Sequence, residues 1–160
     1  MIRRHILAAL AVAAALATAA RAHEYALDGL RIEHPYAVET PPTATAGAGY
    51  LSITNTGTAP DRLIAVRTAF PRSRIHAAEV DAQGVASMRP VDALDIPAGA
   101  TVTLAPAGLH VMFMGLDRPF AADASIPATL VFERAGEIAV EFKVEPRGAG
   151  TAHEMPGMTH

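Results

Sequence analysis

The sequence predicts an all-β domain, an antiparallel β-sandwich or barrel built from short strands. Residues 138–144 alternate strictly between apolar and polar side chains, which is the pattern of a half-buried antiparallel strand. At least seven short segments of strand character recur along the chain, separated by turns that contain proline and glycine. No long helical period appears after residue 22. These three observations together favour a single β domain.

The first 22 residues predict a secretory signal peptide. Arg3 and Arg4 precede an apolar stretch over residues 6–20, and a small-x-small site ends at Ala22. The apolar stretch is shorter than the roughly 20 residues that a membrane-spanning helix needs. We therefore expect an exported, periplasmic protein that has no transmembrane anchor in its mature form and whose domain occupies residues 23–146.

The strands follow one another with short connections. The expected segments are Tyr50–Thr54, Arg62–Arg67, Arg74–Val80, Val85–Met88, a segment around Val102 and Leu104, a segment around His110 and Met112, Thr129–Glu133, and Ile138–Val144. The turn at 134–136 joins the last two segments into a hairpin. Pro146 ends the final strand because proline cannot donate a ladder hydrogen bond.

Residues 147–160 lack the strand pattern of the rest of the chain. Glycines at positions 148 and 150 lead into a segment without apolar periodicity, so we expect a flexible, disordered tail. The tail nevertheless carries two imidazoles and two thioethers within eight residues: His153, Met155, Met158 and His160.

Composition narrows the possible partners. Removal of residues 1–22 takes away three arginines and leaves a formal charge near minus six, which argues against nucleic acid as a partner. The chain contains no cysteine, so neither a disulfide framework nor a lipid-modified cysteine is expected. The fold has to be stable through its hydrophobic core alone.

The most informative chemical feature is the spacing of histidine and methionine. His76, Met88, His110 and Met112 form a His-x11-Met-x21-His-x-Met series. Thioether and imidazole donors without a thiolate favour Cu(I), a soft ion that accepts low coordination numbers. His110 and Met112 emerge on one side of a strand about 7 Å apart, whereas Met114 lies about 13 Å from His110 and is expected to pack or to lie at the fringe.

Two further copper sites follow as weaker hypotheses. His153 and His160 in the tail would accept Cu(II), with Met155 and Met158 available after reduction. Cleavage after Ala22 would leave the α-amine and imidazole of His23 together at the new terminus, and this pair chelates Cu(II).

At these residues the chain resembles the periplasmic PCu(A)C copper chaperones, whose motif is a His, an optional Met, ten residues, a Met, twenty-one residues and His-x-Met. Ala77 occupies the optional Met position. The resemblance extends through residues 23–25, 33–36, 49–51 and 110–116. It implies a cupredoxin-like sandwich that binds Cu(I) near its surface. It also implies delivery to the dinuclear copper centre of cytochrome c oxidase subunit II, often alongside Sco-type chaperones.

Other functions remain open at this point. An electron-transfer cupredoxin is disfavoured because a blue copper centre needs a cysteine thiolate. A copper enzyme with an oxidase-like site at His23 would need a second histidine and turnover with oxygen, and no paired base supports it. A copper-buffering or resistance protein would use the same donors without delivery. A metal-free β-sandwich interaction module fits the strands but leaves the His and Met clustering unexplained.

Overall fold

The computed structural model describes residues 24–148. The predicted signal peptide over residues 1–22 lies outside the described residues, as do His23, His153, Met155, Met158 and His160. Within residues 24–148 no helix is long and apolar enough to cross a membrane.

The described chain is built from strands, which confirms the all-β prediction. The strands are β1 (Glu24–Leu27), β2 (Leu30–Val38), β3 (Ala46–Asn55), β4 (Asp61–Arg67), β5 (Arg72–Val80), β6 (Ala86–Val91), β7 (Leu94–Ile96), β8 (Thr101–Leu104), β9 (Leu109–Met114), β10 (Ser125–Phe132) and β11 (Gly136–Glu145). The predicted final hairpin is the β10–β11 pair, with its turn at residues 133–135, one residue before the expected 134–136.

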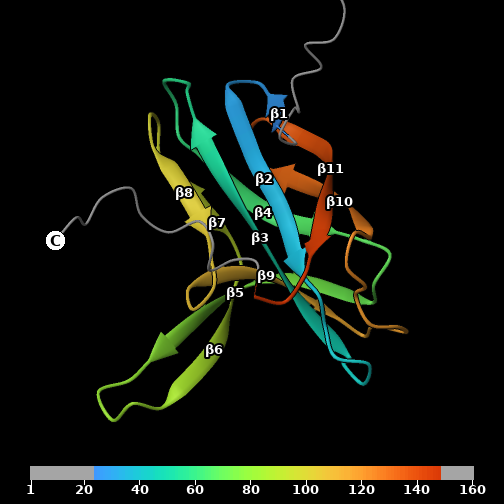
Figure 1. Cartoon of the computed structure of the whole chain (residues 1–160). Helices are drawn as coiled ribbons and strands as arrows, with labels where there is room; N and C mark the ends of the chain where they lie inside the picture. The colour runs from blue at the N-terminus through green and yellow to red at the C-terminus, as the bar shows by residue number, and fades with distance from the viewer. Residues whose placement is uncertain (1–23, 149–160) are drawn as a thin grey trace, which may run out of the picture.

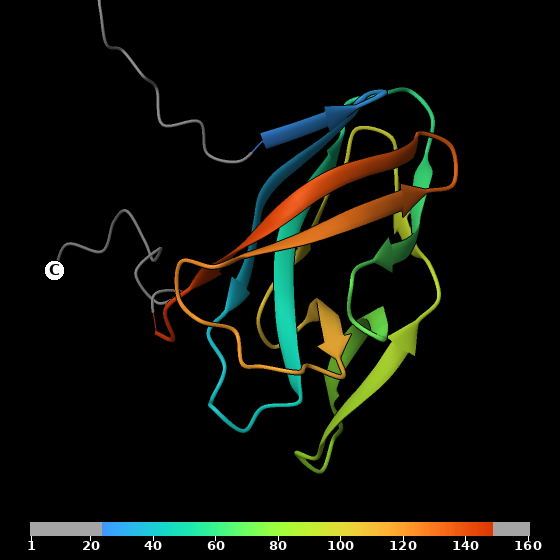
Figure 2. The same cartoon turned by 90° about the vertical axis from the view of Figure 1, so that its right-hand side faces the viewer.

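The strands form one strongly curved sheet. Its hydrogen-bonded order is β6-β5-β9-β3-β2-β11-β10-β4-β7, with β1 added to β2 and β8 added to β3. Because β4 also contacts β5, and β7 contacts β3, the sheet almost closes on itself. Figure 2 shows β10 and β11 as a layer in front of β3. All pairings are antiparallel except that of β2 with β11, two strands far enough apart in sequence to run in the same direction.

Aromatic rings occupy the space between the layers. Phe113 of β9 and Phe142 of β11 are fully buried, and their ring centroids lie 5.5 Å apart in an edge-to-face arrangement. Gly49 of β3 lets both rings approach the backbone, since a Cβ at this position would lie 2.8 Å from Phe113. The side of β9 that carries Phe113 is therefore fixed by core packing.

Strand β2 changes partner halfway along its length. Its first half pairs with β1 and its last three residues pair with β11, and the ladder with β3 is interrupted between Glu33 and Tyr36. His34 lies at this interruption with a positive φ of 50°. Its Nε2 atom lies 3.1 Å from a carboxylate oxygen of Glu145, so the side chain joins the irregular point of β2 to the end of β11.

The β5–β6 hairpin projects from the rest of the molecule (Figure 1). Strand β6 is the outermost strand on its side of the sheet, and its residues are largely exposed. Val80, Val85 and Met88 of this hairpin region are exposed large apolar side chains. Because such exposure is unusual for several neighbouring apolar residues, this hairpin differs from the packed body of the domain.

Candidate metal centre

Neighbouring strands bring the two predicted histidines together. Strand β5 lies between β9 and β6, and His76 of β5 is directly opposite His110 of β9 and Pro90 of β6. Residues that are directly opposite in an antiparallel pair place their side chains on the same face. The imidazole rings of His76 and His110 accordingly stack, with centroids 6.1 Å apart and planes inclined by 22°.

The two predicted methionines lie on the same face. Met112 is two residues from His110 and is directly opposite Arg74, whereas Met88 is directly opposite Ala78. Since Arg74 and Ala78 flank His76 at a spacing of two residues, their side chains share its face. We call this side of β9, β5 and β6 the His/Met face; it carries Arg72, Arg74, His76, Ala78, Met88, Pro90, His110, Met112 and Met114.

The two thioethers occupy opposite corners of this face. Along β5, the positions opposite Met88 and Met112 are four residues apart, and the two methionines stand two strands apart. Standard strand spacings then give about 16 Å between their Cα atoms in a flat sheet. The histidine pair lies between them, so Met88 is the donor that has to move furthest to reach an ion held by the histidines and Met112.

Backbone carbonyls orient both imidazole rings. Nδ1 of His110 lies 3.1 Å from the carbonyl oxygen of Gly108, and Nδ1 of His76 lies 3.4 Å from that of Arg74. A proton on Nδ1 is donated to the carbonyl, which leaves the Nε2 lone pair available as a metal ligand. Within residues 24–148, no group forms a hydrogen bond with Nε2 of either ring.

Burial differs sharply across the face. His110 is 6% exposed, while Met88 is 63% exposed. Val111 and Phe113, which alternate with His110 and Met112 along β9, are fully buried on the core side, as the alternation predicts. Met114 is half-buried at the end of β9, opposite Ala46 and Arg72. The candidate centre therefore has a fixed part on β9 and an exposed part on β6.

The possible metal donors on the His/Met face are imidazole nitrogens and thioether sulfurs, not carboxylate oxygens. Among residues 24–148, no group of three or more His, Cys, Asp or Glu side chains is placed to hold a metal ion. A cation at the histidine pair would have to recruit methionine sulfur, which suits soft Cu(I) better than Zn(II) or Mg(II).

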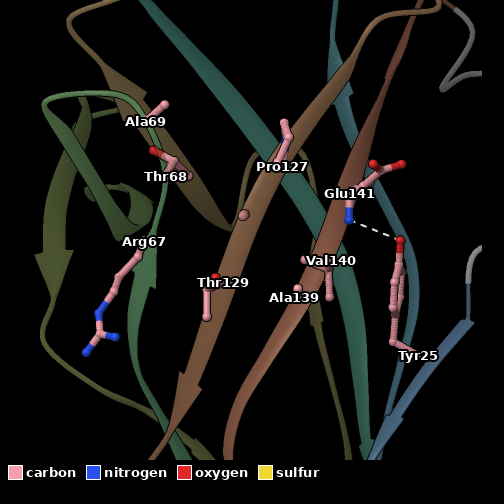
Figure 3. A pocket seen from close by; sticks show the side chains of 10 residues that line it. Tyr25, Arg67, Thr68, Ala69, Pro127, Thr129, Ala139, Val140 and Glu141 are labelled. Carbon is pink, nitrogen blue, oxygen red and sulfur yellow. Dashed lines mark hydrogen bonds between the residues drawn. The ribbon is translucent and has the colours of Figure 1, made fainter.

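The larger hollows of the surface lie elsewhere. One of about 620 Å³ lies over the outer side of β10 and β11 and is bordered by small side chains, with Tyr25 and Arg67 at its edges (Figure 3). The backbone N–H of Glu141 donates a hydrogen bond of 3.0 Å to the Tyr25 hydroxyl there. This hollow contains no histidine or methionine, so it offers none of the donors predicted for the metal.

Two tyrosines continue the row of the histidine pair across the outer surface. Tyr36 of β2 is opposite Tyr50 of β3, and their rings lie 5.1 Å apart. Burial raises the pKa of both phenols above 10, and the pKa of Tyr36 is raised further by Tyr50 and the Glu145 carboxylate. Both phenols therefore remain neutral hydrogen-bond donors at physiological pH.

Comparison with known proteins adds independent information. The family model for "Putative lipoprotein LpqE-like" proteins matches residues 30–144. The chain belongs to the LpqE-like family. A putative lipoprotein of Leifsonia xyli subsp. xyli is 33% identical over 107 residues, which cover 66% of this chain and 63% of that protein. The matched region thus spans less than two thirds of the relative's length.

Solved structures of PCuAC domains resemble this LpqE-like domain closely. The copper-bound PCuAC domain from PmoF2 is 32% identical with a TM-score of 0.66, and the match covers 78% of this chain and 98% of that domain. The Cu(I)-bound DR1885 from Deinococcus radiodurans is 27% identical with a TM-score of 0.58, covering 84% and 88% of the two chains. These likenesses confirm the predicted resemblance to the PCu(A)C family and the cupredoxin-like fold.

Proposed function

We propose that this protein is a periplasmic copper chaperone that binds Cu(I) through His76, Met88, His110 and Met112. The observation that carries the proposal is the register of β9, β5 and β6, which puts all four side chains on one face with the histidine rings stacked. The copper-bound structures of two related domains support copper as the ion. The proposed activity is binding and transfer of an ion, without catalysis.

Transfer to another protein is part of the proposal. Copper passes between proteins when donor ligands are replaced one at a time, so an exposed ligand is an advantage. Met88 is highly exposed on a projecting hairpin, next to Ala78 and Pro90 on the same face. We propose that the acceptor is a copper-receiving protein such as cytochrome c oxidase subunit II or a Sco-type chaperone, and that the protein serves oxidase assembly.

Export and the terminal segments complete the proposal. We propose that residues 1–22 are a cleaved signal peptide, that residues 23–146 form the copper-binding domain and that residues 147–160 are a tail with its own Cu(II) donors. The description of the family and of the Leifsonia relative as lipoproteins supports export. The weaker proposal that the terminal amine and imidazole of His23 bind Cu(II) depends on cleavage directly after Ala22.

A Cu(I) competition titration tests the central assignment. The double variant Met88→Leu and Met112→Leu should lose affinity because leucine conserves volume without offering sulfur. The matched control is Met114→Leu, which changes a thioether of the same strand at the edge of the face and should bind Cu(I) like the parent. Equal affinity of the double variant and the parent would remove the assignment.

Two further measurements separate the finer parts. Truncation after Pro146 should abolish Cu(II) binding by the tail while Cu(I) binding persists, and retention of both would refute the tail site. Transfer is tested by mixing the Cu(I)-loaded protein with the soluble copper-binding domain of an oxidase subunit II. A protein that buffers copper instead would keep its ion in this mixture.

A further inference from the structure

We propose that Arg74 makes the site selective for Cu(I) by holding the carboxylate of Asp92 away from the bound ion. This inference rests on the proposed function, because it concerns the ion bound by His76 and His110. Arg74 and Asp92 are not part of the His/Met donor motif. The role is suggested by the place of Arg74 on the His/Met face and by its ion pair with Asp92.

Arg74 lies inside the candidate centre. It is two residues from His76, directly opposite Met112, and therefore on the same face as both. Asp92 follows directly after the last residue of β6, and one of its carboxylate oxygens accepts a hydrogen bond of 3.1 Å from Nη2 of Arg74. Arg74 thus has Met112 opposite it in the β9–β5 ladder and is bonded to Asp92 at the end of β6.

Among the acidic residues of the β5–β6 hairpin and β9, Asp92 is the one bonded to a residue of the His/Met face. In β5, β6 and β9, the other acidic side chain is Glu79, which alternates with Ala78 and so points to the opposite face. There it accepts a hydrogen bond of 2.7 Å from Nε of Arg89. Asp92, in contrast, stands two residues from Pro90, the residue opposite His76. Released from Arg74, its carboxylate would stand one strand away from His76 and two residues along, a diagonal separation of about 8 Å between Cα atoms that the two side chains can span.

A carboxylate at this point would change which ions bind. Imidazole and thioether groups are neutral, and thioether sulfur favours the soft monovalent ion. Zn(II) and other divalent ions gain strongly from an anionic oxygen ligand. Two histidines with an aspartate would form a common divalent site. By engaging Asp92, Arg74 leaves the face with neutral donors only.

The charge of Arg74 acts in the same direction. Repulsion between a guanidinium and a metal ion is proportional to the charge of the ion, so it is twice as large for a divalent ion as for Cu(I) at equal distance. Arg72 adds a second cation on this face, opposite Met114. The side chains of Arg74 and Asp92 are 52% and 92% exposed, and exposed ion pairs contribute little to stability. Substitution of either residue should leave the fold intact.

The test compares four full-length variants: Arg74→Gln, Asp92→Asn, the double variant, and Arg89→Gln. The last is the matched control, because it breaks a similar ion pair on the opposite face of the same hairpin. Zn(II) titrations are followed by the NMR signals of the His76 and His110 rings, which separates this site from any ion bound by the tail. Cu(I) competition titrations are run in parallel.

Arg74→Gln should raise the Zn(II) affinity of the histidine pair up to about tenfold, because it breaks one exposed ion pair and also removes the guanidinium charge beside the ion. The double variant should lose that gain, and Arg89→Gln should resemble the parent. A Zn(II) affinity unchanged by Arg74→Gln, or a gain that persists in the double variant, would overturn the inference. Failure of the proposed function is recognised separately: the histidine signals of the parent would then not respond to Cu(I) at all.

Discussion

Strands β9 and β6 flank β5, and both contribute to the candidate site. They differ in burial, since β9 packs on the core and β6 is exposed. Strand β9 lies between β5 and β3 in the sheet, and the side chains that alternate with His110 and Met112 are buried in the aromatic core. Strand β6 is an edge strand on a projecting hairpin, with every residue from Ala86 to Pro90 exposed. The β9 half of the site is thus held by core packing, whereas the β6 half is held only by the hydrogen bonds between β6 and β5.

This difference suggests a division of labour. The proposed ligands of β9 stand on a strand held by the core, so they should lose little conformational entropy when Cu(I) binds. Met88, the proposed ligand on the hairpin, would have to be ordered and moved toward the histidine pair; this would weaken its share of the affinity and make it the first ligand that a partner could replace. A chaperone needs both properties, because a site that is fixed on all sides would release its ion slowly.

The largest expected effect concerns the support of β9. Phe113→Ala removes a fully buried ring that contacts Phe142 and Phe120, and should cost about 3–5 kcal/mol of unfolding free energy. Met88→Leu removes nothing from the core and should stay within about 0.5 kcal/mol of the parent, as is usual for surface substitutions. Urea unfolding followed by circular dichroism gives both values.

The comparison would fail if Met88→Leu were as destabilising as Phe113→Ala, since the hairpin would then be part of the packed core. A suitable control is Val111→Ala, a smaller truncation of the same strand on the same side. Its cost should lie between the other two because fewer buried atoms are removed.

The same contrast explains what could be predicted from the sequence. Strand β11 keeps one alternation of apolar and polar residues along its length, and it was predicted to within two residues at each end. Strand β2 was not predicted. Its buried positions are Leu30 and Ile32 and then Pro35 and Ala37, so the irregularity at His34 shifts the alternation by one residue midway. Strand β7 has only three residues, too few for a period.

The sequence predicts the residues of the candidate site but not their arrangement. The spacing of His76, Met88, His110 and Met112 is a property of the sequence, whereas their common face depends on the registers of β5 with β9 and β6. Strands β5 and β9 are far apart along the chain, and alternation alone does not determine which residue lies opposite which. For the same reason, Arg74 and Asp92 could not be recognised as neighbours of the donors from sequence.

A smaller effect separates the ligands of the two strands. His110→Gln should lower the Cu(I) affinity roughly 100-fold or more, because changes beside metal ligands alone cost about 10–100-fold. Met88→Leu should lower it only about tenfold, because this donor contributes after an ordering step. Competition titrations with a colorimetric Cu(I) chelator measure both. Equal losses would mean that the hairpin is as well fixed in the loaded protein as β9 is.

The smallest effect concerns the tyrosines beside the histidine pair, on the fixed side of the site. The folded state raises the pKa of Tyr36 and Tyr50, mainly through burial, so folding favours the neutral phenols. Their contribution to stability is complete below pH 10, the ordinary pKa of tyrosine, and is lost as the pH rises through the raised values. The unfolding free energy should therefore fall above pH 10, and the Tyr36→Phe, Tyr50→Phe double variant should show a shallower fall.

The control is Tyr25→Phe, which alters the tyrosine that lies outside the Tyr36–Tyr50 pair. If the alkaline fall is as steep in the double variant as in the parent, groups elsewhere in the barrel titrate with unfolding, and the two phenols are not linked to the stability of the fixed half of the site.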